Sequence, residues 1–363
     1  MIQAKKAVII GDHKQLPAVI NPALYDGEKV ELDERQYCKK EIFDVSYFQK
    51  LYESCPKENK SSLDTQYRMP SVIGTMISNL FYEGKLKNGV NTEQKKPIYG
   101  KKNLCIIDMS NEKEYVEDDK FSPVNRAEAE YVLKLLNDIQ AKTKGVKIAV
   151  ITPYRGQKNL IRRLLLNSKI YHQDNIHIDT VDSFQGDEAE IVIYCTTRSK
   201  KRTQFLSDRR RINVAISRTK NEFIMIASVQ YLDGFANKEP IKQVLNYIKK
   251  NGTIQPPKQF AKAENISTNR DIILIKEIVF NNEIGDDMSF EQKIKQEVEH
   301  YNKEGKFSCY PRVDKSDELY IMKGNFEIYY AALQLSLSEL IVEVSNTNSA
   351  INIKNYSKQI AIN

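Results

Sequence analysis

The sequence predicts a doubly wound α/β domain with a largely parallel sheet, followed by a small α+β domain. Short apolar runs that could be buried on both faces recur at residues 7–10, 104–107, 147–152, 176–180, 190–195 and 222–227. Segments with helical periodicity separate most of these runs. Alternating strands and helices of this kind are typical of a parallel sheet with helices on both faces.

Four segments between the predicted strands have the apolar spacing of helices. Residues 70–81 place their apolar side chains on one stripe, and Gly84 offers a stop. The stripe contains Val72, Ile73, Met76, Ile77, Leu80 and Phe81. Residues 125–140, 157–166 and 208–218 are the other predicted helices. Ligands of a doubly wound sheet bind beyond the carboxyl ends of its strands, so the polar residues there are the candidates for a site.

The sequence of the last quarter of the chain predicts a separate folding unit. Residues 251–268 combine Gly, a Pro pair and polar residues, which is typical of a linker. Apolar runs at residues 271–280, 318–324 and 339–346 and a helical pattern at residues 289–302 then predict a small α+β domain over residues 269–363. This tail domain contains no chemical motif and no internal repeat, so its role is not predicted.

Composition narrows the class of protein. The chain has 41% hydrophobic and 28% charged residues, as ordinary globular proteins do, and lacks the run of about 18 to 20 apolar residues that spans a bilayer. It also lacks a secretory signal, so we expect an intracellular protein, cytoplasmic or nuclear. The five cysteines are Cys38, Cys55, Cys105, Cys195 and Cys309. They are scattered and odd in number, which argues against a disulfide framework or a zinc site and favours reduced, mostly buried thiols.

Charge is unevenly distributed along the chain. The net charge is +7, but residues 1–264 carry 44 basic against 33 acidic residues, whereas residues 265–363 carry 11 against 15. The excess of basic residues suggests that residues 1–264 bind a polyanion, and the acidic tail domain suggests a protein partner.

Five polar segments follow one another in a fixed order. They are GDHKQLP (11–17), LDTQYRMPSVIGTMISNLFYEGKL (63–86), ITPYRGQ (151–157), IDTVDSFQGDEAEIVI (178–193) and FLSDRRRINVAISRTK (205–220). In this order they resemble helicase motifs three to six of superfamily 1, in the branch that contains the nonsense-mediated-decay helicase and senataxin. The resemblance covers about residues 6–230 and does not reach the tail domain.

The resemblance implies a RecA-like fold. Residues 1–17 then correspond to the last strand and motif three of a first RecA-like domain, and residues 18–250 to the second RecA-like domain. Three positions depart from the usual pattern: Ala18 replaces a second proline, Pro70 replaces a histidine, and the ending ISRTK replaces TRA. None of these changes removes a charged group, but they leave the subfamily open.

The resemblance also implies catalytic roles. Phosphoryl transfer builds negative charge on the γ-phosphate, and a guanidinium can direct two donors at such a group. Arg68 and Arg218 match the arginines that enter the ATP cleft from the second RecA-like domain, and Gln15 matches the glutamine that senses the γ-phosphate or the attacking water. Without the motif order, a salt bridge would explain either arginine equally well.

Three further residues are assigned to the nucleotide by the same resemblance. Gly186 lets the backbone approach a phosphate, and Glu188 matches the acid that binds the ribose. Asp12 lies beside Gln15 at the strand end, where it either faces the nucleotide or caps its own turn.

The nucleic-acid contacts are expected on the other strand ends. Thr152, Tyr154 and Thr180 match positions that line the channel under the single strand in the family. The Tyr154 ring either stacks on a base or covers the sheet edge. The basic run at residues 198–211 either contacts phosphates or is a solvated loop.

The expected function is the C-terminal motor half of an ATP-dependent helicase that moves 5′ to 3′ on single-stranded RNA or DNA. Its expected cofactors are ATP and Mg²⁺. These 363 residues contain no P-loop (Gly-x-x-x-x-Gly-Lys followed by Ser or Thr) and no matching acidic pair, so the Mg²⁺ ligands are expected on the first RecA-like half. The chain is then a fragment, a subunit that pairs with a separate half, or a non-catalytic interaction module. We expect no ATP hydrolysis by this chain alone.

Overall fold

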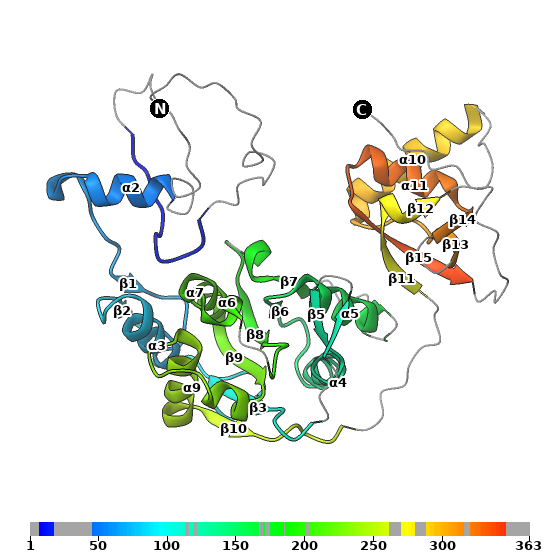
Figure 1. Cartoon of the computed structure of the whole chain (residues 1–363). Helices are drawn as coiled ribbons and strands as arrows, with labels where there is room; N and C mark the ends of the chain where they lie inside the picture. Colours follow the sequence, from blue (N-terminus) through cyan, green and yellow to red (C-terminus); the bar gives the residue numbers. More distant parts are fainter. Residues whose placement is uncertain are drawn as a thin grey trace. The chain divides into compact units, whose positions relative to one another are not determined.

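The computed structural model describes residues 7–17, 46–112, 116–119, 122–166, 168, 170, 175–184, 186–200, 203–260, 270–279, 288–315 and 320–345. The chain divides into two compact units (Figure 1). The larger unit comprises Met1–Lys158 and Asp174–Phe260, and the smaller comprises Asn159–Gln173 and Ala261–Asn363. None of the helices in the described ranges is long and apolar enough to cross a membrane.

A six-stranded parallel sheet forms the centre of the larger unit. Its order is β10-β3-β9-β8-β6-β7, and every neighbouring pair is parallel. The strands are β3 (Leu104–Asp108), β6 (Ile148–Thr152), β7 (Ile176–Thr180), β8 (Ala189–Cys195), β9 (Thr219–Ala227) and β10 (Thr253–Gln255). The predicted doubly wound α/β class is confirmed.

Helices connect the strands, as crossovers between parallel strands require. They are α3 (Ser71–Phe81), α4 (Arg126–Lys142), α5 (Arg155–Leu166), η3 (Val181–Phe184), α6 (Gln204–Ser207), α7 (Arg209–Ser217), α8 (Val229–Asp233) and α9 (Pro240–Asn251). Two further helices, α2 (Tyr47–Ser54) and η2 (Lys57–Asn59), precede β1. Asp208 caps α7, because its Oδ1 accepts hydrogen bonds from the main-chain N–H groups of Arg210 and Arg211 at 2.9 and 3.1 Å. The four predicted helices are all present.

Both faces of the sheet are buried. Phe223 and Met225 of β9 belong to a core that also contains α3, α7 and α9, whereas the alternate residues Ile224 and Ile226 are buried on the opposite side. This two-sided burial explains why the strands read as continuous apolar runs rather than as an alternating pattern.

Two predictions about strands were wrong. Residues 7–10 form no strand: Val8 and Ile10 are 90% and 86% exposed, and no segment within the described ranges pairs with them. A strand needs a hydrogen-bonded neighbour, so apolar sequence alone does not make one. Conversely, β10 lies inside the predicted linker and pairs with Cys105–Ile107 at the sheet edge. Residues 261–268 of that linker and Ala18 lie outside the described residues.

Two short strand pairs were not predicted. The strands β1 (Thr65–Gln66) and β2 (Lys87–Asn88) pair in parallel, and β4 (Val116–Asp119) and β5 (Ser122–Asn125) form an antiparallel pair. Polar residues make up at least half of each of these strands, so the strands give no apolar signal. The first pair is the one that positions the site described below.

The tail contains its own mixed sheet, as expected for a small α+β domain. Its elements are β11 (Arg270–Leu274), η4 (Ile275–Glu277), β12 (Ile278–Val279), α10 (Met288–Glu304), β13 (Arg312–Lys315), β14 (Tyr320–Gly324), α11 (Phe326–Gln334) and β15 (Glu339–Ser345). The strand order is β11-β15-β13-β14-β12, with both parallel and antiparallel pairs. Val313, Ile328 and Val342 are fully buried in its core. The elements β13 and α11 were not predicted.

Cysteine pairing is not seen among the described residues. Cys55, Cys105, Cys195 and Cys309 are free thiols, and Cys105 and Cys195 are buried. Burial raises the pKa of both buried thiols, so they stay protonated. The expectation of mostly buried thiols holds for these two, whereas Cys309 is exposed and Cys38 lies outside the described residues.

Candidate functional site

Arg218 is a buried cation without a carboxylate partner in the described part of the chain. It follows the last turn of α7 and is 3% exposed. Its Nε donates to the Val214 carbonyl, its Nη1 to the Asp187 carbonyl, and its Nη2 to Gln15 Oε1 and Ser217 Oγ, each at 3.1 Å. All these acceptors are neutral, so the guanidinium is fixed in position without a directly bonded carboxylate, and Glu188 and Asp12 act on its charge only from a distance. Burying such a charge is costly, which suggests an anionic ligand.

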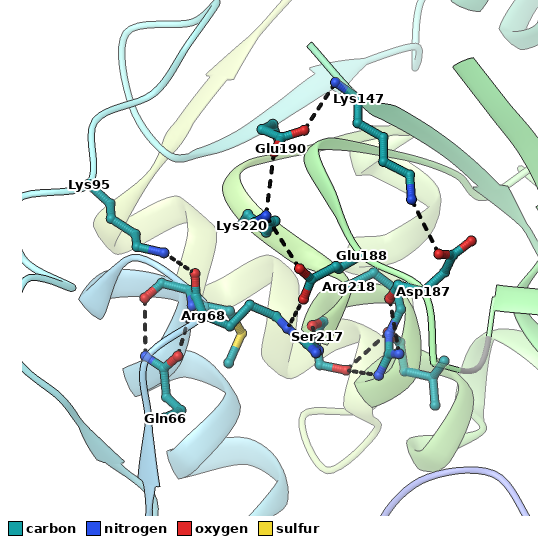
Figure 2. Close-up of polar contacts among 12 residues, drawn as sticks. Gln66, Arg68, Lys95, Lys147, Asp187, Glu188, Glu190, Ser217, Arg218 and Lys220 are labelled. Atoms are coloured by element: carbon teal, nitrogen blue, oxygen red, sulfur yellow. Dashed lines mark hydrogen bonds and ion pairs between the residues drawn. The ribbon is translucent and has the colours of Figure 1, made fainter. Parts of the chain in front are cut away.

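Arg68 brings a second guanidinium to the same place (Figure 2). It follows β1, and its Nη1 donates to the Ser217 carbonyl at 3.1 Å while its Nε pairs with Glu188 Oε2 at 2.8 Å. Burial, followed by the nearby Arg68 charge, lowers the pKa of Arg218. A negative group between the two arginines would relieve this repulsion.

A side-chain clamp fixes the loop that carries Arg68. The Gln66 amide bonds both main-chain groups of Met69: Nε2 donates to its carbonyl at 3.1 Å, and Oε1 accepts from its N–H at 2.8 Å. Gln66 Nε2 also donates to Asn88 Oδ1 at 2.7 Å, so β2 supports the clamp. Lys95 donates to the Arg68 carbonyl (Figure 2). Arg68 therefore projects from a braced turn rather than from a free loop.

Glu188 is shared between two cations. Its Oε2 binds Arg68, and its Oε1 lies 3.3 Å from Lys220 Nζ, which also lies 3.5 Å from Glu190 Oε1 (Figure 2). Burial alone would raise the pKa of Glu188, but Lys220 and Arg68 hold it below its usual range. Gly186, two residues earlier, has a backbone φ of 99°, a conformation that residues with a side chain rarely adopt.

Gln15 and Asp12 reach this region on the loop at residues 11–17. The Gln15 amide accepts from Arg218 as described. The Asp12 carboxylate accepts from the Lys14 N–H at 2.9 Å, so it does cap its own turn, and from the Tyr82 hydroxyl at 2.5 Å. The structure thus brings together four of the six residues assigned to the nucleotide: Gln15, Arg68, Glu188 and Arg218. We call these four residues the nucleotide cluster.

A known protein family accounts for most of the larger unit. A family model described as "AAA domain" (AAA_12) matches residues 43–230. The chain belongs to this family of superfamily 1 helicase domains. The α/β sheet of the helicase domain agrees with the RecA-like fold that the motif order implies.

Three curated helicases illustrate the relationship. Regulator of nonsense transcripts 1 of Caenorhabditis elegans is 33% identical over 246 residues, which cover 63% of this chain and 21% of that protein. Helicase sen1 of Schizosaccharomyces pombe is 28% identical over 247 residues, covering 63% and 13%. The 5′-3′ DNA helicase ZGRF1 of Mus musculus is 30% identical over 235 residues, covering 63% and 12%. The predicted branch is confirmed, and this chain spans less than a quarter of each of these relatives.

Two residues of the helicase domain that the motifs did not single out connect the loop at 11–17 to α7. The Asn213 side chain is fully buried, and its Nδ2 donates to the Lys14 carbonyl at 2.9 Å and to the Tyr82 hydroxyl at 3.0 Å. Tyr82 donates in turn to Asp12. Burial, together with the Asp12 charge, raises the pKa of Tyr82. A sequence signal existed for Asn213, because an amide interrupts the apolar stretch between Ile212 and Ile216.

The residues expected under the nucleic-acid strand are arranged differently. Thr152 is fully buried and its hydroxyl lies 3.1 Å from that of Thr197. Tyr154 is 6% exposed, its hydroxyl lies 2.7 Å from Thr203 Oγ1, and its ring packs on Phe205 at 5.5 Å between centroids. Thr180 is more accessible, and its hydroxyl lies 3.3 Å from Ser183 Oγ. We call Thr152, Tyr154 and Thr180 the strand group.

No group of three or more His, Cys, Asp or Glu side chains that could hold a metal ion occurs in the described part of the helicase domain or tail. The donors present instead suit a phosphate. Two guanidinium groups and a glutamine amide converge, and a carboxylate that could accept ribose hydroxyls lies beside them.

Proposed function

We propose that this chain is the C-terminal motor half of an ATP-dependent helicase that couples ATP hydrolysis to 5′ to 3′ movement along single-stranded nucleic acid. The observation that carries the proposal is the convergence of Arg68 and Arg218 on Ser217. One arginine bonds the Ser217 carbonyl and the other its hydroxyl, so both cations are held ready for one anion.

The cluster suits the chemistry of γ-phosphate cleavage. Negative charge spreads over the γ-phosphate oxygens during transfer, and fixed cations stabilise it without reorganisation. Arg218 supplies the buried, immobile charge, and Gln15 sits against it where the attacking water would be oriented. Mg²⁺, when bound with ATP, would neutralise phosphate charge; its ligands are expected on the first RecA-like half.

Nucleotide binding would also change the partners of Arg68. In this structure Glu188 occupies its Nε, at 2.8 Å. A ribose hydroxyl donating to Glu188 would weaken that ion pair and free the guanidinium for phosphate. The neighbouring Tyr67 ring is 62% exposed, which leaves an aromatic face available to a base. Closure of the two RecA-like halves around ATP, and their separation after hydrolysis, would then step the strand.

The names of the relatives support the direction and the energy source. The mouse relative is named a 5′-3′ DNA helicase, and a second Schizosaccharomyces pombe relative is named "ATP-dependent helicase upf1". We extend these properties to this chain as part of the proposal, with RNA or DNA as the strand.

An ATP turnover assay tests the proposal. The protein should join these residues to a first RecA-like half that carries a P-loop, and the assay should run with and without single-stranded nucleic acid. We expect turnover that the strand stimulates, and none from the 363-residue chain alone. Turnover by the chain alone, or joined protein that binds ATP without hydrolysing it, would contradict the proposal and favour a non-catalytic module.

A further inference from the structure

A second basic site lies at the opposite end of α7 from Arg218. A cavity of about 230 Å³ is lined by His13, Lys14, Gln49, Phe81, Arg209 and Arg210. We call it the basic pocket. Arg209 and Arg210 begin the nine-residue helix whose C-terminal end precedes Arg218, so roughly 13 Å of helix separates the pocket from the nucleotide cluster. The two sites share no residue.

The pocket is assembled from four elements, namely the loop at residues 11–17, α2, α3 and α7. The loop at residues 11–17 docks on α2, where His13 stacks on Tyr52 with 5.0 Å between ring centroids. A Cβ on Gly11 would lie 2.9 Å from ring atoms of Phe48, so this approach suits glycine. The first residues of α7 and the end of α3 complete the walls, with the buried Phe81 as an apolar surface.

The two arginines of the pocket are oriented by neutral groups. Arg209 donates to the Leu80 carbonyl at 2.9 Å, and Arg210 donates to Gln49 Oε1 at 2.8 Å. Within the described ranges of the chain, neither arginine forms an ion pair. Their neighbour Arg211 differs, because it pairs with Asp208 at 3.1 Å and Asp182 at 3.3 Å.

The remaining charge in the pocket is also positive. Among the residues that the structure describes, no acidic side chain lines the cavity. Lys14 lies 3.5 Å from Glu83, but that carboxylate is 62% exposed and lies closer to Lys85, at 2.6 Å. An exposed pair of this length compensates little charge. The pocket therefore holds oriented donors and an excess of positive charge.

We infer that the basic pocket binds a phosphate group. Guanidinium groups fixed by neutral acceptors match the oxygens of a phosphate, and Lys14 and His13 add further donors. Two sources present the same chemistry: a phosphodiester of a single strand, and a free polyphosphate. The strand source rests on the proposed function, whereas the polyphosphate source does not.

Binding to the 363-residue chain tests the inference with two probes. One is a fluorescently labelled single-stranded oligonucleotide followed by anisotropy over a range of salt concentrations, and the other is inorganic pyrophosphate followed by calorimetry. Each of Arg209→Ala and Arg210→Ala should weaken binding roughly tenfold, the loss of about one charge-assisted contact. For the strand, each should also lower the salt slope by about 0.7.

Two further variants control for charge and folding. Lys250→Ala removes the same charge from an exposed position on α9 and should change binding of either probe by less than about twofold. Gln49→Glu keeps an acceptor for Arg210 but places a carboxylate in the pocket, so it should abolish the site without removing any donor of α7.

The outcomes separate the sources. Loss of oligonucleotide binding in the pocket variants supports a strand phosphate, and loss of pyrophosphate binding alone supports a free polyphosphate. The inference would be overturned if the pocket variants bound both probes as well as Lys250→Ala does. It would also be overturned if the unsubstituted chain bound neither probe. In that case, ATP turnover should be measured in a joined protein that carries Arg210→Ala and Gln49→Glu. Turnover that the strand still stimulates would show that the proposed function does not depend on the basic pocket.

Discussion

The nucleotide cluster comes from the loop at residues 11–17, from the residues next to β1 and β8, and from the end of α7, whereas the strand group lies at the ends of β6 and β7. The two sets differ in exposure and in how their polar groups are paired. In the cluster, the Arg68 and Glu188 side chains are 37% and 40% exposed, and Arg218 has no directly bonded carboxylate among the described residues. In the strand group, Thr152 and Tyr154 are buried and their hydroxyls already have partners. A ligand can thus meet Arg68 and Glu188 directly, whereas a strand would have to displace internal contacts to reach Thr152 and Tyr154.

This difference separates residues that suit a ligand, in the nucleotide cluster, from residues that support the fold, in the strand group. A buried cation that no carboxylate bonds directly is a sign of ligand chemistry, because a purely structural cation normally has a bonded anionic partner. The hydroxyls of Thr152 and Tyr154 already have hydrogen-bond partners, and the Tyr154 ring packs on Phe205. These contacts fit a structural role as well as they fit strand binding. The comparison therefore predicts that substitutions in the cluster change catalysis, and that substitutions of Thr152 and Tyr154 change stability first.

The largest expected effect is on ATP turnover. In a protein that joins these residues to a P-loop half, Arg218→Ala should lower kcat about 10³-fold, the usual contribution of an arginine at the γ-phosphate. Nucleotide binding, measured by calorimetry, should change little. Arg68→Ala should cost less, because Arg68 is more exposed and pairs with Glu188. Equal losses, or an unchanged kcat for Arg218→Ala, would remove the distinction between the two arginines.

The next effect should be on stability in the strand group. Tyr154→Ala removes a buried ring packed on Phe205 and should lower the free energy of unfolding by about 3 kcal/mol, measured by urea denaturation. Thr180→Ala, at a more accessible position, should cost under about 0.5 kcal/mol. If Tyr154→Ala leaves stability intact but abolishes strand binding, the comparison fails and the ring acts as a base-stacking surface.

A smaller effect should follow from Tyr82→Phe. This change removes the hydroxyl between Asp12 and Asn213 and leaves both partly unsatisfied, so it should cost about 1 to 3 kcal/mol of unfolding free energy. Tyr247→Phe is the matched control, because its hydroxyl makes a single hydrogen bond, to the Val72 carbonyl at 3.0 Å, and its loss should cost about 1 kcal/mol. Equal costs for the two variants would show that Tyr82 does not brace the loop at residues 11–17.

The smallest effect is a pH dependence outside both regions. Glu222 is fully buried and accepts three main-chain hydrogen bonds at 2.9 to 3.1 Å, yet burial raises its pKa. Between its usual pKa and the raised one, the folded state holds a proton that the unfolded state has lost. Unfolding free energy should therefore fall as pH rises through this window. Glu222→Gln should flatten that slope in denaturation curves, and an identical slope would assign it to other groups.

The sequence predicted the members of the nucleotide cluster better than their partners. Arg68 and Arg218 belong to motifs with characteristic neighbours, so order along the chain was enough to predict that they lie together. Ser217, Tyr82 and Asn213 contribute through contacts between distant segments, such as the hydrogen bond from Arg68 to the Ser217 carbonyl. Their roles depend on how the helices pack, which local pattern does not specify.

Parts of the fold were missed for related reasons. The edge strand β10 has only three residues inside a segment rich in Gly and Pro, so composition outweighed the pairing that tertiary structure provides. The run at residues 7–10 has strand composition, but no described segment pairs with it. The long helices and central strands were found because their patterns repeat over many residues.

Ser217 gives the two arginines a common anchor. Its carbonyl holds Arg68, its hydroxyl holds Arg218, and it is the last residue of α7. A small rotation of that turn would displace both guanidinium groups together. In the proposed motor, the grip on phosphate is consequently engaged or released as a unit, so the timing of a step is set by one helix end rather than by two independent side chains.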